Sequence, residues 1–390
     1  MTTTPQLTRS AEALAVAALT LVGFAIALNV QVLAALGPFL DAELELEDGE
    51  FGSLVATGWI AGAVGSLVLL PVVDRIGRRT PILLGGVVFG VASAWHLAVR
   101  DASTLLLVRA IAGFAGGGVF TVASAAVADL VPYDRRARAM GIFNLSIFLA
   151  APIGMPIATA CAEAGSWQAI FGVQVVATVL ALAGAFYTLP SDIGRGGESL
   201  DIGVLRLPSV GPALLSVVLY SGAFATTVQF LGIWLDSANI VPKEEQEGLW
   251  LTLGLVSAVG TIGLTRFADA IGKRRFIVLT SVVVATGLAC LPSVDSLLAL
   301  TLVGAPIAAC TAARSGAMLA LITGLAPSNR RGALMVWRSV AVSAGMGVIV
   351  YVGGVVHRHT SGFDAIFWFA AGSVALSLLL VLACVREVGR

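Results

Sequence analysis

Charged residues are scarce in this chain of 390 residues, where Asp, Glu, Lys and Arg together make up 12%. Soluble domains carry about 25% charged residues. A chain with half that share lacks the polar groups needed to cover a water-facing surface, and hydrophobic residues account for 58% of it. The composition therefore excludes an ordinary soluble domain and indicates an integral membrane protein.

Residues that usually carry catalysis or bind metals are also rare. The chain has four cysteines and three histidines, and the cysteines lack the spacing of a metal site, so we expect buried thiols rather than disulfides. A membrane enzyme needs a nucleophile with a base, or metal ligands, within its helices, and no such set is recognisable. We expect no enzyme activity, no metal and no cofactor, and no proton relay through His96, His357 or His359.

Long apolar runs are what the chain has in abundance. Twelve are long enough for transmembrane helices, and spanning strands are excluded because they would be short and would alternate at every second residue. The first run is longer than the apolar core of a signal peptide, so we expect it to be retained. The runs cover residues 13–39, 51–73, 80–99, 103–129, 138–161, 167–189, 209–235, 248–269, 275–292, 296–325, 332–355 and 363–385.

One sequence unit is written twice, with a displacement of 195 residues that is half of the chain. The segment Asp74–Arg79 (DRIGRR) recurs as Asp269–Arg274 (DAIGKR). Such repeats in an apolar chain are typical of transporters, whose binding site lies between the repeats. We predict an all-α membrane protein of two pseudosymmetric six-helix bundles, residues 1–190 and 209–390. The segment 191–208 is predicted to be a flexible cytoplasmic linker.

The charges are distributed unevenly between the two sides of these predicted helices. Most of the 23 basic residues lie at the termini or in the connections on the side of the repeated motif, and only Arg100, Lys243 and Arg358 lie in the opposite connections. The positive-inside rule makes the motif side cytoplasmic, with both termini on that side. We expect the protein to reside in a bacterial inner membrane.

Three basic residues lie away from the ends of the apolar runs, namely Arg109, Arg314 and Arg338, while every acidic residue falls in a connection or at a helix end. Arg314 lies roughly 16 Å from the cytoplasmic end of its helix, near the membrane midplane. An arginine at that depth costs at least about 2.5 kcal/mol and usually faces a cavity or a partner. Without a carboxylate in the helices, its partners are carbonyls, hydroxyls, water or an anionic ligand.

Each of these arginines has a functional and a structural interpretation. Arg314 contacts a ligand or gate, or it bonds to neighbouring helices. Arg109, near the outer end of its helix, touches substrate or controls coupling, or it snorkels to the interface or holds helices together. Arg338, near the cytoplasmic end of its helix, closes an inner gate, or it binds a loop carboxylate or a lipid phosphate.

The motifs resemble those of the major facilitator superfamily over the whole chain. The repeated segment with Asp74, Arg75, Gly77, Arg78 and Arg79 matches the signature that follows the second helix in that family. The pair Arg109 and Gly113 is similar to its fourth-helix signature. The segment 154–157 (GMPI) with Trp167 resembles the drug and sugar efflux branch.

This resemblance implies a central cavity lined mainly by the first, fourth, seventh and tenth helices. On these helices we expect the substrate to contact Arg314, Arg109, Asn29, Gln31, Tyr220, Gln229 and Thr311. Residues near the cytoplasmic ends are expected to control the conformational cycle through ion pairs, or else only to set topology. They are Asp74, Arg75, Gly77, Arg78, Arg79, Asp269, Lys273 and Arg338.

We therefore predict a secondary transporter that moves a small organic solute by alternating access. Two deep arginines without carboxylate partners favour an anionic solute. The alternative is a proton-coupled drug or sugar efflux transporter, which the efflux-like segment supports; a third is a non-transporting assembly or receptor protein on the same scaffold. The expected partners are the solute, the lipid bilayer and a coupling ion, either a proton or a counter-anion. We expect a monomer that binds no nucleic acid.

Overall fold

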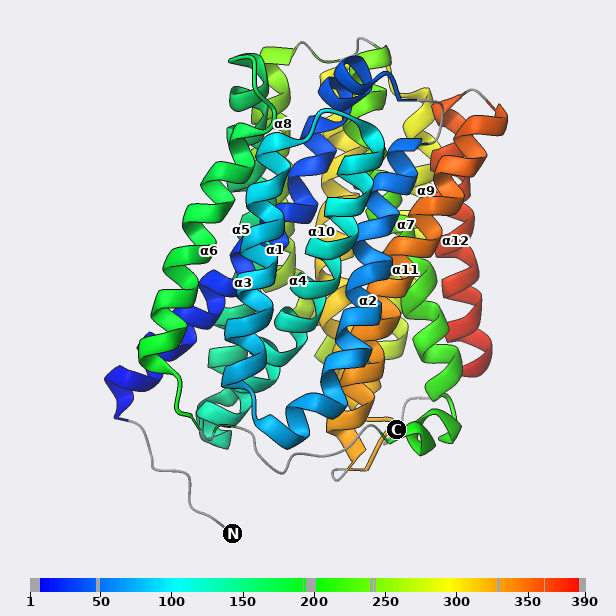
Figure 1. Ribbon diagram of the computed structural model, residues 1–390. Coiled ribbons are helices and arrows are strands. Elements are labelled where there is room, and N and C mark those ends of the chain that lie inside the picture. The colour runs from blue at the N-terminus through cyan, green and yellow to red at the C-terminus, as the bar shows by residue number, and fades with distance from the viewer. Residues whose placement is uncertain are drawn as a thin grey trace. The chain divides into compact units, whose positions relative to one another are not determined.

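The computed structural model describes residues 8–46, 50–191, 193, 201–238, 241, 243–327, 330–360 and 362–385. This part of the chain contains twelve α-helices and three short 3₁₀ helices (Figure 1). The α-helices are α1 Arg9–Leu44, α2 Glu50–Ile76, α3 Arg79–Trp95, α4 Ala102–Leu130, α5 Tyr133–Glu163, α6 Ala169–Thr188, α7 Val210–Ala238, α8 Lys243–Ile271, α9 Lys273–Cys290, α10 Leu297–Thr323, α11 Arg331–Thr360 and α12 Phe363–Cys384. The 3₁₀ helices are η1 His96–Ala98, η2 Ile202–Arg206 and η3 Leu291–Ser293.

The predicted all-α membrane fold is confirmed, with one helix at each of the twelve apolar runs. Eleven of the helices in the described part are long and apolar enough to cross a membrane, and α8 contributes a shorter apolar stretch, Gly248–Gly260. Large apolar side chains are left exposed on α3, α6 and α12. The exposed fraction is 64% for Leu84, 59% for Val176 and 63% for Trp368. Such exposure has no penalty in lipid, which explains why these helices are apolar on all sides.

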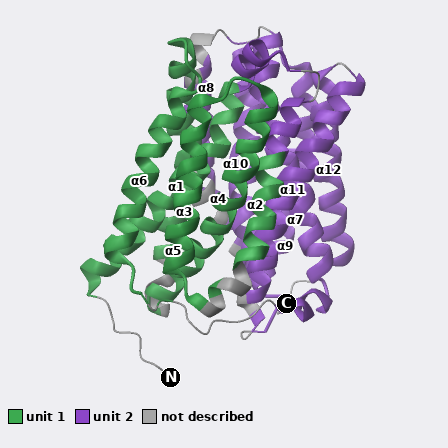
Figure 2. Cartoon of the chain, viewed as in Figure 1, with its two compact units in different colours: residues 1–36, 57–200 green, residues 37–56, 201–390 purple. Residues whose placement is uncertain are grey.

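The chain forms two compact units (Figure 2). Unit 1 contains residues 1–36 and 57–200, and unit 2 contains residues 37–56 and 201–390. The last turns of α1 and the first turns of α2 therefore belong with unit 2. There, the Phe51 ring packs edge-on against the Phe230 ring, with 5.8 Å between their centroids.

The repeat in the sequence is also a repeat in the backbone. Gly77 and Gly272 follow the second helix of each unit and have left-handed φ angles of 81° and 95°, which glycine adopts without strain. The fourth helices are capped by side chains that accept a backbone N–H three residues on, from Asp101 in α4 and from Ser296 in α10. Both pairs are separated by 195 residues, the displacement found in the sequence.

Small residues allow the second and fourth helices of each unit to touch through their backbones. A Cβ on Gly65 of α2 would overlap the carbonyl oxygen of Phe114 on α4. In unit 2 a Cβ on Gly260 of α8 would lie 2.6 Å from the Cα of Ala309 on α10. These two contacts are again displaced by 195 residues. Close approach through small residues is how helices associate where lipid provides no hydrophobic driving force.

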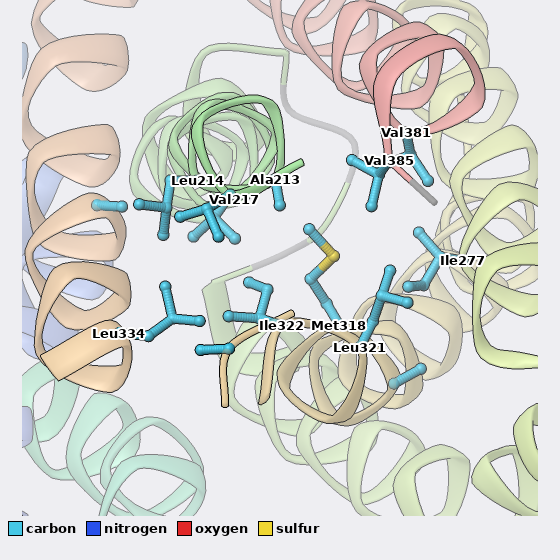
Figure 3. Packing of buried hydrophobic residues seen from close by; sticks show 14 of the residues in the cluster. Ala213, Leu214, Val217, Ile277, Met318, Leu321, Ile322, Leu334, Val381 and Val385 are labelled. Atoms are coloured by element: carbon cyan, nitrogen blue, oxygen red, sulfur yellow. The ribbon is translucent and has the colours of Figure 1, made fainter. Parts of the chain in front are cut away.

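The buried core of unit 2 joins its six helices (Figure 3). Side chains from α7, α8, α9, α10, α11 and α12 meet there, among them Val217, Ile277 and Leu321. Val204, from η2 in the segment predicted to be a flexible linker, is fully buried in the same core. Asp201 also forms an ion pair with Arg330 at 3.1 Å. Residues 201–206 therefore pack on unit 2, and the glycines on which the predicted flexibility depends, in residues 194–200, lie outside the described part.

Candidate functional site

Arg314 lies in the interior of unit 2 and is held by hydroxyl groups from three other helices. Its Nε donates to Ser281 Oγ of α9 at 2.9 Å, and its Nη2 donates to Ser377 Oγ of α12 at 3.0 Å and to Ser216 Oγ of α7 at 3.5 Å. Ser281 and Ser377 donate their own protons to helix carbonyls, so their oxygens are free to accept from the guanidinium. The side chain is 2% exposed.

An aromatic ring completes the enclosure of this guanidinium. The Cζ atom of Arg314 lies 3.5 Å from the centroid of the Tyr220 ring on α7. A cation over an aromatic face is stabilised by about 2 kcal/mol when both groups are desolvated. Tyr220 in turn donates its hydroxyl to Thr311 Oγ1 at 3.1 Å, which adds a further contact between α7 and α10. Three residues that the sequence analysis assigned to substrate binding, Arg314, Tyr220 and Thr311, thus form one cluster.

Arg109 lies in a second cluster, within unit 1. Its Nη1 donates both to the backbone carbonyl of Asn29 at 2.8 Å and to Asn29 Oδ1 at 2.6 Å. Asn29 Nδ2 donates to Gln174 Oε1 at 3.2 Å, and Gln174 Nε2 donates to the carbonyl of Ala25 at 3.2 Å. Arg109 has no exposed surface. The suggestion that it snorkels to the interface is therefore wrong, and it links α4 to α1 and, through Asn29, to α6.

The cluster around Arg109 is less completely hydrogen-bonded than the one around Arg314. The Nε and Nη2 atoms of Arg109 are buried and have no hydrogen-bond partner in the described part of the chain. Gly58 of α2 packs against this guanidinium, and a Cβ at that position would lie 2.6 Å from Nη2. Buried donors without acceptors are costly, and more so on a charged group, so this guanidinium retains the capacity to bind two acceptor atoms.

The internal repeat provides a comparison within the same chain, because equivalent positions in the other half are apolar. The positions 195 residues after Asn29 and Arg109 are Phe224 and Gly304. The positions 195 residues before Tyr220, Thr311 and Arg314 are Ala25, Gly116 and Val119. Val119 is fully buried. Each bundle therefore folds without a counterpart of the arginine cluster that the other bundle contains.

The repeated motif forms contacts within each unit. Arg78 pairs with Asp129 at the end of α4. Arg79 Nη2 donates to the carbonyl of Phe186 near the end of α6 at 2.7 Å, and in unit 2 Arg274 Nε donates to the carbonyl of Val381 near the end of α12 at 3.3 Å. Both arginines thus bind carbonyls in the last turn of the sixth helix of their bundle, where a cation also complements the helix dipole.

The remaining predicted site residues lie apart from the two clusters or outside the described part. The side chains of Asp74, Arg75 and Asp269 are outside it. Lys273 is half-buried, as is Arg338, whose buried Nε has no partner among the described residues. Gln31 is half-buried on α1. Gln229 is buried on α7, nine residues and about 14 Å beyond Tyr220.

Several residues of the clusters were missed in the sequence analysis. Ser216, Ser281 and Ser377 hold Arg314, and Gln174 orients Asn29. Their signal in the sequence is weak, since each is a single small or neutral polar residue in an apolar run. Among the described residues no three His, Cys, Asp or Glu side chains are grouped to hold a metal. Each cluster places one guanidinium group among uncharged hydrogen-bonding groups.

Comparison with protein families gives a match along almost the whole chain. The model of the Major Facilitator Superfamily matches residues 19–265 and 245–389. The inner membrane transport protein YdhP of Escherichia coli K12 is 24% identical over 221 residues, which are 56% of this chain and 57% of YdhP. The chain thus spans little more than half the length of that relative.

Two further bacterial proteins are similar over longer stretches. The uncharacterized MFS-type transporter YwfA of Bacillus subtilis 168 is 23% identical over 337 residues, covering 84% of this chain and 81% of YwfA. The chloramphenicol resistance protein of Streptomyces lividans is 26% identical over 256 residues, covering 63% of each protein.

A solved structure shares the fold. The crystal structure of a bacterial homologue of the human lysosomal transporter Spinster, in an inward-facing and unoccupied conformation, superposes with a TM-score of 0.73 at 14% identity. The superposition covers 97% of this chain and 96% of the other.

Proposed function

The chain belongs to the Major Facilitator Superfamily, a family of secondary transporters, and we propose that its solute is a small organic anion moved by alternating access. The observation that carries the proposal is the pair of buried guanidinium groups. In the described part of the chain, neither Arg109 nor Arg314 pairs with a carboxylate. Each is bonded only to neutral groups, so each leaves a positive charge inside the membrane.

The internal repeat supports a functional reason for these charges. A buried arginine destabilises a bundle unless a partner stabilises its charge, because the guanidinium loses its hydration. The opposite half builds the same six-helix fold with Gly304 and Val119 at the corresponding positions. The fold therefore does not require the arginines, and an anionic solute is the partner that their charge favours.

The two arginines differ in how many hydrogen-bond donors are free to bind a solute. Arg109 has two buried N–H donors without acceptors, whereas Arg314 is covered by Tyr220 and three hydroxyl groups. A solute reaches Arg314 only when Tyr220 or one of the serines moves aside. We include Asn29, Gln31, Gln229 and Thr311 in the proposed solute path.

The proposal extends to sidedness and to the conformational cycle. The excess of basic residues around the repeated motif supports cytoplasmic termini, and similarity to an inner membrane transport protein supports a bacterial inner membrane. The motif residues, with Arg338, control the cycle from the cytoplasmic ends. Residues 1–190 and 209–390 act as the two moving bundles of a monomer.

Uptake into liposomes tests the proposed solute class. Radiolabelled benzoate and succinate are supplied under imposed pH and voltage gradients to the wild type, Arg314→Val and Arg100→Ala. Valine copies the equivalent residue of the other half, so the substitution suits the fold, and Arg100 is an exposed arginine that serves as the matched control. Loss of a charged hydrogen bond to the solute is worth about 1.5–3 kcal/mol, so we expect uptake to fall roughly 10- to 100-fold in Arg314→Val alone.

Two results contradict this proposal in different ways. Equal anion uptake by Arg314→Val and the wild type would show that Arg314 does not bind the solute. Concentrative uptake of a neutral or cationic drug, without uptake of either anion, would show that the solute is not an organic anion.

A second candidate function is proton-coupled drug efflux. The observation that favours it is the similarity to the chloramphenicol resistance protein of Streptomyces lividans. The test is accumulation of labelled chloramphenicol in cells that express the protein, before and after an uncoupler collapses the proton gradient. Lower accumulation that rises on uncoupling supports efflux, and equal accumulation in expressing and control cells excludes this drug.

A further inference from the structure

His96 is a titratable side chain at the end of α3 that the clusters described above do not use. It has no exposed surface and stacks on Phe171 of α6, with 4.1 Å between the ring centroids and 13° between the planes. Its Nδ1 lies 2.9 Å from the carbonyl oxygen of Ala92. Its Nε2 is buried and has no hydrogen-bond partner in the described part of the chain.

These contacts determine which nitrogen of His96 is able to accept a proton. A carbonyl oxygen only accepts hydrogen bonds, so Nδ1 carries the hydrogen that lies toward Ala92. In a neutral imidazole the other nitrogen then has the free lone pair. Nε2 is therefore a buried basic atom without a donor, an arrangement that proteins usually avoid.

The internal repeat shows that the fold does not need a histidine here. The position 195 residues later is Leu291, which is 3% exposed and begins η3 as His96 begins η1. A leucine thus fills the same place in unit 2. The backbone N–H of residue 96 also donates to the Ala92 carbonyl, so that carbonyl keeps a partner without the imidazole.

Few other groups in the helices are able to carry a proton. Every carboxylate of the sequence falls in a connection or at the end of an apolar run. Histidine is the side chain whose charge ordinarily changes near neutral pH. Of the three histidines, His359 is exposed, His357 is half-buried and His96 alone is fully enclosed.

The charged groups around His96 come from one neighbouring helix. Arg109 of α4 is the charged side chain that acts on the imidazole among the described residues. From α6 it meets the uncharged Phe171, and in the connection that follows, Arg100 and Asp101 are exposed. Burial disfavours the protonated imidazole most, and the positive charge of Arg109 adds to this; an anion bound to Arg109 offsets the second contribution.

We propose, against the expectation from the sequence alone, that His96 is the proton-binding residue of this transporter, and that it takes a proton onto Nε2 when an anionic solute lies beside Arg109. This inference rests on the proposed anion transport. The proton comes from water on one side of the membrane and is released from Nε2 to water on the other side, as the solute arrives and leaves. Solute and proton are thereby moved in the same direction, because the negative charge of one favours the positive charge of the other.

Transport assays separate proton coupling from solute binding. His96→Leu copies Leu291, His96→Gln is a second variant in case leucine impairs folding, and His357→Leu is the matched control. In liposomes we expect both His96 variants to lose pH-gradient-driven accumulation of benzoate by about tenfold or more, while counterflow exchange, which needs no net proton movement, stays within about twofold of wild type. The control variant should retain both activities.

A titration of the purified protein tests the proposal without transport. In lipid nanodiscs the protein with ¹⁵N-labelled histidine gives ring-nitrogen signals from three histidines, and His96→Leu identifies those of His96. We expect benzoate, compared with uncharged benzyl alcohol, to move the protonation midpoint of His96 upward by about one pH unit, equivalent to about 1.4 kcal/mol.

The outcomes distinguish this inference from the proposed function. Absence of anion uptake by the wild type counts against the proposed function, and the titration then decides the role of His96. Proton-driven accumulation that is unchanged in both His96 variants overturns the inference alone. A protonation midpoint of His96 that benzoate moves no further than benzyl alcohol does also overturns it.

Discussion

Gly58 packs against the guanidinium of Arg109, and this contact limits the size of the residue at position 58. A Cβ at Gly58 would lie 2.6 Å from Nη2 and 3.2 Å from Cζ of Arg109. Gly141 of α5 is a matched position in a helix, where a Cβ would meet nothing within 4 Å. The two glycines therefore separate local crowding from the general effect of adding a methyl group to a helix.

We expect Gly58→Ala to lower the free energy of unfolding by about 1–3 kcal/mol, because either the arginine or α2 must shift. Gly141→Ala should be neutral or stabilising by up to about 1 kcal/mol, since it only restricts the unfolded chain. Thermal unfolding in detergent measures both. An unaffected Gly58→Ala protein would show that Arg109 moves at no cost and is not firmly held by Asn29.

At the same residue scale, sequence reasoning located the arginines but not their partners. The depth of Arg314 follows from counting along an apolar run. Its acceptors do not, because Ser281 and Ser377 lie 33 and 63 residues away and become neighbours only when four helices pack together. Serines in a membrane helix often bond to their own backbone, so their presence alone predicts no arginine site.

At the scale of elements, the start of α4 contains a pH-dependent cap. Hydrogen bonds from the side chain of Ser103, the backbone N–H of Thr104 and the hydroxyl of Thr104 lower the pKa of Asp101 from 3.8 to about 2. A carboxyl group whose pKa is lower in the folded state stabilises that state above its ordinary pKa. This contribution is present above pH 3.8 and is lost as the pH falls to about 2.

We expect Asp101→Asn to unfold at a lower temperature than the wild type above about pH 4, with the difference shrinking as the pH approaches about 2. Asparagine keeps an acceptor for the N–H of Thr104 but does not titrate. Thermal unfolding across this pH range measures the effect. The uncharged cap Ser296 of α10 gives the control, since the loss caused by Ser296→Ala should not depend on pH; a constant difference for Asp101→Asn would contradict the prediction.

Elements were predicted best where both halves of the sequence contain the same feature. Gly77 and Gly272 mark the same turn in both halves, and both adopt the left-handed conformation. The 3₁₀ helix η2 was not predicted, because its segment contains no long apolar run. Val204 is buried in one core with residues of α10, α11 and α12 that lie more than 100 positions away, which no local pattern reveals.

At the scale of the whole molecule, the proposed sidedness can be tested with the native cysteines. Cys290 at the end of α9 and Cys384 at the end of α12 are free and exposed. With cytoplasmic termini, α9 ends outside and α12 ends inside. A membrane-impermeant maleimide on intact cells should therefore label Cys290 but not Cys384, and permeabilised cells should label both. The variants Cys290→Ser and Cys384→Ser identify each signal, and labelling of Cys384 in intact cells would reverse the topology.

The sequence by itself determined the membrane class, the twelve helices and the duplication. These depend on composition and on the spacing of residues along the chain, and local physics decides them. Tertiary structure alone decided that Arg109 and Arg314 are enclosed in separate clusters, and that Nε2 of His96 is left without a partner. Such contacts join helices that are distant in sequence, and the energy of a buried polar group depends on which atoms packing places beside it.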